Sequence, residues 1–165
     1  MNARGRSYRY VGPADLEAAV RPGSGGCRIS SAADFGSWVA ERSAAELAEP
    51  FTFVVGTDSM MRLAPRRSEH VACAGEISFI HEAGRWAVGE VSNQSTGYCP
   101  DVSSWSAVAP ALDGTELGRP SDFTYEVVFR RCPECQEHNI VREDDFVYVF
   151  CGSDLPRSWN VDPAV

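Results

Sequence analysis

Apolar residues first recur at helical spacing in the stretch that ends at Pro50. Serine is a favoured helix N-cap, and a proline cannot continue a helix, so we expect one helix between Ser31 and Pro50. Its apolar positions fall mostly on one side and are Phe35, Trp38, Val39 and Leu47. A shorter helix is predicted over residues 13–20, because a proline suits the first helical turn and Pro22-Gly23 follows.

From Phe51 the spacing of apolar residues changes from about 3.6 to about 2, which indicates strands. Two hairpins are predicted, with turns at residues 56–59 and 82–84. A further helix is expected after Asp101, which we interpret as its cap, and Pro110 would shorten or kink it. The predicted strands of this region are residues 51–55, 60–64, 76–81, 85–91 and 123–131.

The C-terminal region carries three cysteines at the spacing of metal ligands. Cys132 and Cys135 form a Cys-x-x-Cys knuckle, and Cys151 follows later in the chain. A zinc ribbon places two such knuckles on hairpin turns, so that four thiolates surround one metal ion. In the second knuckle, Tyr148 stands where the first thiolate is expected. The motif therefore predicts a ribbon that lacks one ligand.

Three interpretations of this motif remain open. Zinc is the candidate cofactor, held by the three cysteines, with His138, Cys99 or water as a fourth ligand. Alternatively, the ribbon has lost its metal and Tyr148 fills the space by packing. A redox role for the Cys132–Cys135 pair is the third interpretation, although no thioredoxin-like pattern surrounds it.

These patterns predict an α+β fold with an antiparallel sheet of about six strands, two or three helices and a C-terminal zinc-ribbon-like hairpin. We expect a single domain over residues 1–165. Within it, residues 123–160 would form the ribbon-like subregion, continuous with the core sheet. Residues 139–141 and 146–150 are expected to pair with each other as a small hairpin.

A second candidate region is the polar, mostly uncharged loop of residues 90–100. It could be a binding surface built from amides and hydroxyls, or a connector whose side chains satisfy its own backbone. The run of residues 66–70 would supply the charges that the loop lacks, if the two segments meet. The candidate ligand-binding residues are Arg66, Arg67, Glu69, His70, Asn93, Gln94, Ser95, Thr96 and Tyr98.

Composition narrows the classes of partner. The formal net charge of −8 argues against nonspecific nucleic-acid binding, which depends on a basic surface. No apolar run reaches the roughly 18 residues of a membrane helix, and the basic N-terminus lacks the apolar core of a signal peptide. We therefore expect a cytoplasmic protein that does not bind membranes, with reduced cysteines. The oligomeric state is left open.

Three motifs together resemble an uncharacterised family of actinobacterial proteins: residues 66–75, residues 90–100 and the terminal segment from Cys-Pro-x-Cys to Leu155-Pro156-x-x-Trp159-Asn160. In that family the second knuckle is Cys-x-x-Cys, so Tyr148 departs from the pattern. Residues 95–100 are also similar, in part, to the Ser-Gly-His-Tyr-x-Pro signature of plant calmodulin-binding proteins, but lack its histidine. Neither resemblance implies an established activity.

The sequence contains no recognised catalytic signature. The hypothesis about function therefore rests on the ribbon. The leading expectation is a cytoplasmic binding or adaptor module with a degenerate zinc ribbon, and its expected partner is a protein. The alternative is a small-molecule enzyme or sensor for an anionic or nucleotide-like ligand. Its site would combine residues 66–70 with the loop of residues 93–98.

Overall fold

The computed structural model describes residues 6–12, 27–63, 70–148 and 151–161. The helix expected over residues 13–20 lies outside these residues. The helical elements are α2 (Ala32–Ala40), α3 (Ala44–Leu47), the 3-10 helix η1 (Val102–Ser104) and α4 (Trp105–Asp113). The strands are β1 (Tyr8–Arg9), β2 (Cys27–Ile29), β3 (Phe51–Gly56), β4 (Met61–Leu63), β5 (His70–Glu82), β6 (Arg85–Ser92), β7 (Val128–Arg131) and β8 (His138–Val141).

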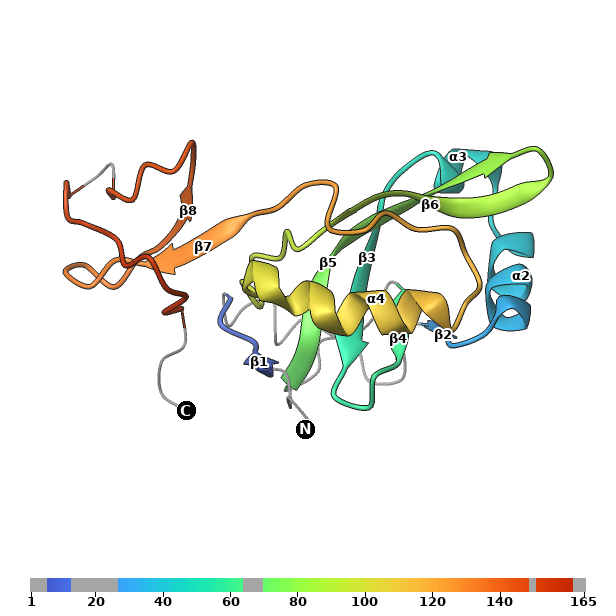
Figure 1. Cartoon of the computed structure of the whole chain (residues 1–165), viewed down its shortest axis with the longest axis horizontal. Helices are drawn as coiled ribbons and strands as arrows, with labels where there is room; N and C mark the ends of the chain where they lie inside the picture. Colours follow the sequence, from blue (N-terminus) through green and yellow to red (C-terminus); the bar gives the residue numbers. More distant parts are fainter. Residues whose placement is uncertain (1–5, 13–26, 64–69, 149–150, 162–165) are drawn as a thin grey trace.

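Six strands form one antiparallel sheet in the order β1-β5-β3-β4-β2, with β6 paired to the C-terminal half of β5. The long strand β5 carries β3 on one side, while β1 and β6 pair with its two ends on the other. Both predicted hairpins, β3–β4 and β5–β6, are present. The structure thus confirms the predicted α+β fold with its sheet of about six strands (Figure 1).

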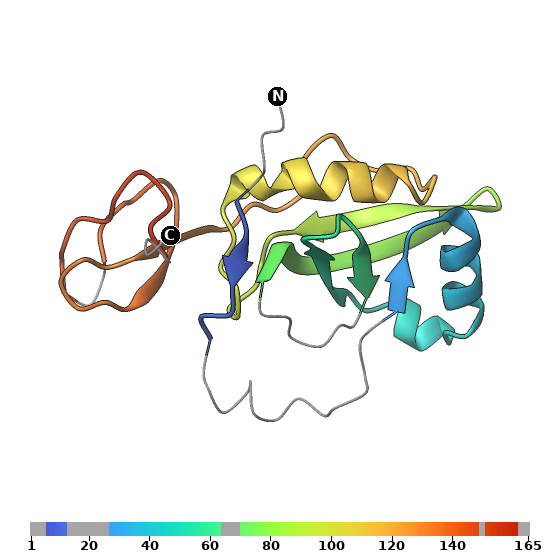
Figure 2. The same cartoon turned by 90° about the horizontal axis from the view of Figure 1, so that it is seen from below.

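The main core lies between this sheet and the helices α4 and α2. Helix α4 runs across one face of the sheet (Figure 2), and it buries Val108 and Leu112 against that face. Helix α2 contributes Phe35 and Trp38, which pack against Phe79 of β5. Because side chains alternate along a strand, every second residue of β3 reaches this core.

The opposite face of the sheet is covered by the loop after β6 and by the C-terminal segment. Val54 of β3 and Val71 of β5 point to this face, where they pack with the buried Tyr8 and Tyr98. The ring of Trp159 adds to the cluster and meets Tyr8 edge-on, with ring centroids 5.2 Å apart. Residues distant in sequence therefore close the second face.

The prediction of a single helix between Ser31 and Pro50 is wrong in one respect, because the structure has two helices there, α2 and α3. Ser31 caps α2 as predicted, since its hydroxyl accepts a hydrogen bond from the Asp34 N–H at 3.1 Å. Ser43 caps a second helix, α3, and its side chain forms a reciprocal capping box with that of Glu46. This local arrangement competes successfully with continuation of α2.

The strands expected near the C-terminus also differ from the prediction. The strand predicted over residues 123–131 is regular only in β7, and β7 pairs with β8 in a separate two-stranded sheet. Residues 139–141 therefore do not pair with residues 146–148 as expected, and residues 149–150 of the predicted strand lie outside the described part of the chain. Instead, the segment from Phe146 to Tyr148 pairs with residues 153–155, through hydrogen bonds such as Leu155 N–H to Phe146 C=O at 2.7 Å.

The chain between α4 and β7 is attached to the end of β6 by a buried amide. The Asn93 side chain is fully buried; it donates to the C=O of Val127 and accepts from the Val127 N–H, both at 2.7 Å. It also donates to Pro100 C=O at 3.0 Å. Gly75 of β5 allows the end of β6 to lie this close, since a Cβ at Gly75 would collide with the carbonyl oxygen of Ser92. Asn93 thus fixes where the ribbon leaves the sheet.

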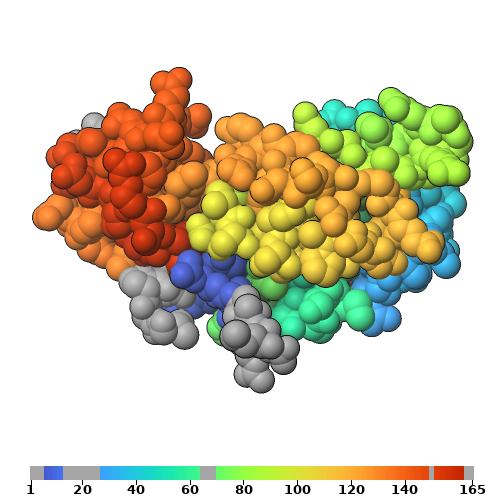
Figure 3. Space-filling model, viewed as in Figure 1, coloured from blue at the N-terminus to red at the C-terminus, as the bar shows by residue number. Residues whose placement is uncertain are grey.

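The C-terminal segment ties the ribbon back to the body. Asn160 forms two hydrogen bonds with the backbone of Arg131, at 2.8 Å and 2.7 Å, and Trp159 donates to Cys99 C=O at 2.7 Å. The buried Arg130 guanidinium donates to the carbonyls of Pro156 and Arg157. Figure 3 shows the C-terminal part of the chain packed directly against the body.

Within the described part of the chain, none of the helices has the length and apolar character needed to cross a membrane.

Replacing Asn93 tests its role in joining the two parts. Asn93→Ala should lower the free energy of unfolding by about 2 to 4 kcal/mol, because it leaves the N–H and C=O of Val127 buried without partners. Urea denaturation followed by circular dichroism measures the change. The matched control is the exposed neighbour Gln94→Ala, which should change stability by no more than about 0.5 kcal/mol. Equal effects of the two substitutions would contradict this role.

Candidate metal centre

The first knuckle forms the turn between β7 and β8. The Gln136 N–H donates to Cys132 C=O at 2.9 Å, and the Cys132 N–H donates to Glu137 C=O at 2.8 Å. Gln136 adopts a left-handed conformation with φ 66°. This turn brings Cys135 back beside Cys132.

The second knuckle repeats the same backbone pattern. The Gly152 N–H donates to Tyr148 C=O at 2.7 Å, and the Tyr148 N–H donates to Ser153 C=O at 2.8 Å. Gly152 has φ 72°, close to the value at the corresponding residue of the first knuckle. The hydrogen bonds therefore place Tyr148 at the position equivalent to Cys132, and Cys151 at the position equivalent to Cys135.

The two knuckles bring three sulfurs together. The Sγ atoms of Cys132, Cys135 and Cys151 all lie within 4.8 Å of one another. Cys132 Sγ is 3.4 Å from Cys151 Sγ, and Cys151 Sγ is 4.0 Å from Cys135 Sγ. Cys132 is buried, while the other two are exposed. Thiolates at this separation could hold one metal ion, because a single ion can reach all three.

The backbone of the first knuckle favours the thiolate form of one cysteine. The N–H groups of Cys135 and Glu134 donate to Cys132 and lower the pKa of its thiol to about 7, against the opposing effect of burial. The Glu137 N–H acts in the same direction on Cys135, yet burial and the neighbouring thiols outweigh it and raise the pKa of Cys135. A cation in the centre would relieve this repulsion between sulfurs.

Tyr148 fills part of the space beside the sulfurs. It is buried and packs in a small apolar cluster with Cys132, Val141 and Leu155. Burial raises the pKa of its hydroxyl, and the negative charge of Cys135 raises it further. A neutral phenol is a weak metal ligand, so the second knuckle supplies one thiolate and the whole centre supplies three.

The other two candidate fourth ligands do not join this group. Side chains alternate along β8, so His138 points with Ile140 toward the body, on the opposite face from Val141, which packs with Cys132. Cys99 lies in the cluster between the body and the ribbon, and burial raises the pKa of its thiol to about 12. Among the described residues, neither has a ligand atom within the three-sulfur group.

The polar loop divides between structural and exposed residues. Asn93 is structural, and the Ser95 hydroxyl accepts a hydrogen bond from the Tyr98 N–H at 3.2 Å. Tyr98 is buried against the sheet. Gln94 and Thr96 are exposed, and they line two different pockets. The loop is therefore largely a connector, with two side chains left for ligands.

The charged run of residues 66–70, which would supply the charges that the loop lacks if the two segments meet, can be placed only at its last residue. Arg66, Arg67 and Glu69 lie outside the described residues. His70 is exposed on β5, where it pairs with Arg9 of β1. His70 lines neither the pocket that contains Gln94 nor the pocket that contains Thr96.

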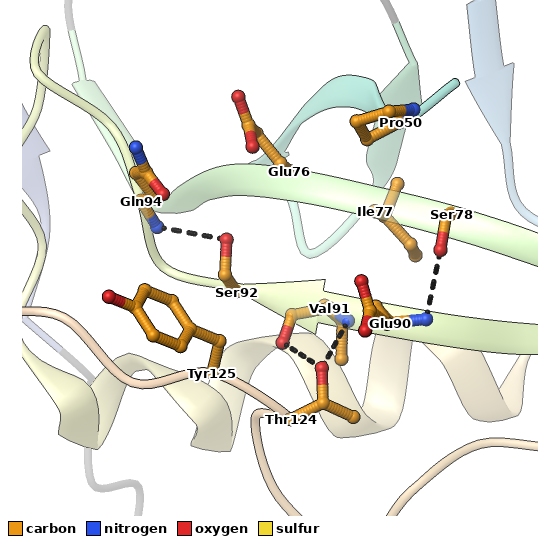
Figure 4. Close-up of a pocket in the computed structure, with 10 residues that line it drawn as sticks. All are labelled: Pro50, Glu76, Ile77, Ser78, Glu90, Val91, Ser92, Gln94, Thr124 and Tyr125. Atoms are coloured by element: carbon orange, nitrogen blue, oxygen red, sulfur yellow. Dashed lines mark hydrogen bonds between the residues drawn. The ribbon is translucent and has the colours of Figure 1, made fainter.

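A further pocket of about 170 Å³ lies over the β5–β6 hairpin (Figure 4). Its lining includes the carboxylates of Glu76 and Glu90, the Gln94 amide and the exposed Tyr125 ring. Thr124 closes one side through hydrogen bonds to the Val91 backbone at 2.8 Å and 3.0 Å. Sequence reasoning did not identify Glu76 or Tyr125, because residues 123–127 reach β6 only through tertiary contacts. The pocket carries negative charge and does not suit the expected anion.

Comparisons with models of protein families, with curated proteins and with solved structures found no match to this chain. The resemblances drawn from its motifs therefore stay predictions. The geometry of the three sulfurs is the observation on which a functional argument can rest.

Proposed function

We propose that the protein is a cytoplasmic binding or adaptor module, and that zinc held by Cys132, Cys135 and Cys151 stabilises its C-terminal ribbon. The observation that carries the proposal is the meeting of three sulfurs on two knuckles with the same hydrogen-bond pattern.

Zinc fits the spacing and chemistry of these ligands. Sulfurs about 2.3 Å from a tetrahedral zinc ion lie about 3.8 Å from one another. The separations of 3.4 Å between Cys132 Sγ and Cys151 Sγ and of 4.0 Å between Cys151 Sγ and Cys135 Sγ fall on either side of this value. Only small movements of these sulfurs are therefore needed. Thiolates are soft ligands that select zinc over magnesium or calcium. Water or a group from a partner would complete the tetrahedron, since Tyr148 offers no thiolate.

An adaptor role is supported by the position of the ribbon. The β7–β8 sheet and both knuckles lie at one end of the molecule, away from the β5–β6 hairpin (Figure 1). Cys135 and Cys151 are exposed there, so the turns around the metal are open to a partner. Metal binding would hold these turns in one conformation and lower the entropy lost when a partner binds.

Metal analysis tests the zinc site directly. Protein purified at neutral pH under reducing conditions should contain one zinc per chain, measured by plasma mass spectrometry. Cys135→Ser should remove it, because two thiolates retain zinc poorly. Cys27→Ser is the matched control, since Cys27 is also exposed but lies outside the three-sulfur group, and it should keep the metal. Wild-type protein without zinc, or equal loss in both variants, would contradict the site.

Restoring the fourth thiolate tests the equivalence of the two knuckles. Tyr148→Cys should bind zinc roughly tenfold more tightly or better, given that loss of even an outer-shell partner costs about 10- to 100-fold. Competition with a chromophoric chelator measures the affinity. Tyr148→Phe keeps three thiolates and should bind as the wild type does. No gain in affinity for Tyr148→Cys would show that position 148 is not a ligand position.

The adaptor role can be tested by affinity capture from a lysate of the source cells. At least one protein should be retained by the wild type and by Cys27→Ser but lost with Cys135→Ser, because that substitution releases the knuckles. Quantitative mass spectrometry of the three eluates makes the comparison. An identical set of proteins in all three eluates would count against binding through the ribbon.

A further inference from the structure

A pocket of about 330 Å³ lies in the seam between the body and the ribbon. One wall is the loop after β6, through Thr96 and Cys99. The other is the ribbon sheet, through Phe129 of β7, His138 and Ile140 of β8, and the following Arg142. Its volume is at the lower end of the range for small-molecule sites, about 300 to 1,000 Å³.

The floor of this pocket is apolar and lies on a buried cluster. Phe129 and Cys99 are 3% exposed, and they belong to one buried cluster with Val127 and Val161. Ile140 packs on the same cluster. Ile140 is the partly exposed apolar residue of this floor, and it favours the apolar part of a ligand, since covering it removes hydrocarbon surface from water.

The rim is polar and carries positive charge. Among the described residues, the guanidinium of Arg142 and the imidazole of His138 have no hydrogen bond or ion pair. Other arginines do have carboxylate partners, such as Arg62 with Asp58 at 2.7 Å and Arg119 with Asp113 at 2.7 Å. Arg142 is therefore available to an anion.

His138 and Thr96 add hydrogen-bonding groups on either side of the seam. Burial and the positive charge of Arg131 lower the pKa of His138, so the neutral imidazole offers one donor and one acceptor near pH 7. Thr96 is exposed on the opposite wall. Arg142 provides the permanent charge, and its planar guanidinium suits a carboxylate.

We propose that this seam binds a small organic carboxylate, with the carboxylate on Arg142, His138 and Thr96 and an apolar group over Phe129 and Ile140. The site uses no residue of the three-sulfur centre, so it extends beyond the proposed zinc module and is tested separately. It differs from the anion site expected from the sequence, because Thr96 is the one loop candidate that contributes and the charge comes from the ribbon.

Titration of the 15N-labelled protein with benzoate and with 3-phenylpropanoate, each against its carboxamide, tests the proposal. The carboxylates should shift the backbone amides of Thr96, Asn139 and Ile140 saturably, and the neutral carboxamides should not. Arg142→Gln should weaken carboxylate binding about tenfold, the effect of losing a hydrogen bond to a charged group. Arg85→Gln, at the tip of the β5–β6 hairpin, is the matched control and should bind as the wild type does.

Several results would overturn the proposal. Absence of saturable shifts with both carboxylates would remove the site, and equal shifts from the carboxamides would remove the role of charge. Unchanged carboxylate affinity in Arg142→Gln would show that Arg142 does not bind the carboxylate. Inorganic phosphate should bind more weakly than benzoate; equal affinity would show that the apolar floor contributes nothing. Zinc content measured on the same samples keeps failure of this site distinct from failure of the metal centre.

Discussion

The hydrogen bonds of the Asn93 side chain determine how the two parts of the molecule meet. A buried amide with three partners is costly to leave partly paired, so it favours one path for the chain. That path leads residues 123–127 along β6 and into β7. The seam between body and ribbon begins at this point, and the contacts of Arg130, Trp159 and Asn160 then tie the C-terminal segment across it. A polar side chain in the interior thus acts as the main architectural contact.

The alternation of side chains along β7 and β8 then gives the small sheet two separate roles. One face, with Val128 and Val141, continues into the cluster around Cys132 and Tyr148. The other face, with Phe129 and Ile140, packs on the body and carries His138. A two-stranded sheet has little core of its own, so each face depends on what covers it. The candidate metal centre and the candidate carboxylate pocket consequently share a scaffold without sharing residues.

Sequence reasoning predicted what depends on neighbours in the chain. The β3–β4 and β5–β6 hairpins followed from alternation and turn residues, and the knuckle at Cys132 from its spacing. The break at Ser43 could have been found, since Ser43-x-x-Glu46 is a capping-box signature. A Cys-x-x-Cys knuckle is itself a hairpin turn, which was a signal for pairing β7 with β8. Thr96 and Arg142 line one pocket only because Asn93 joins the ribbon to the body at this point, and no local sequence pattern indicates it.

The matched backbone of the two knuckles has an evolutionary consequence. Tyrosine and cysteine codons differ by a single base, and the hydrogen bonds at position 148 already suit a ligand-bearing turn. No backbone rearrangement separates a three-sulfur centre from a four-sulfur one, so the two forms can interconvert within a lineage without loss of the fold. Selection could then adjust, through one codon, how firmly a metal ion at this centre would be retained, from an exchangeable ion to a permanent one.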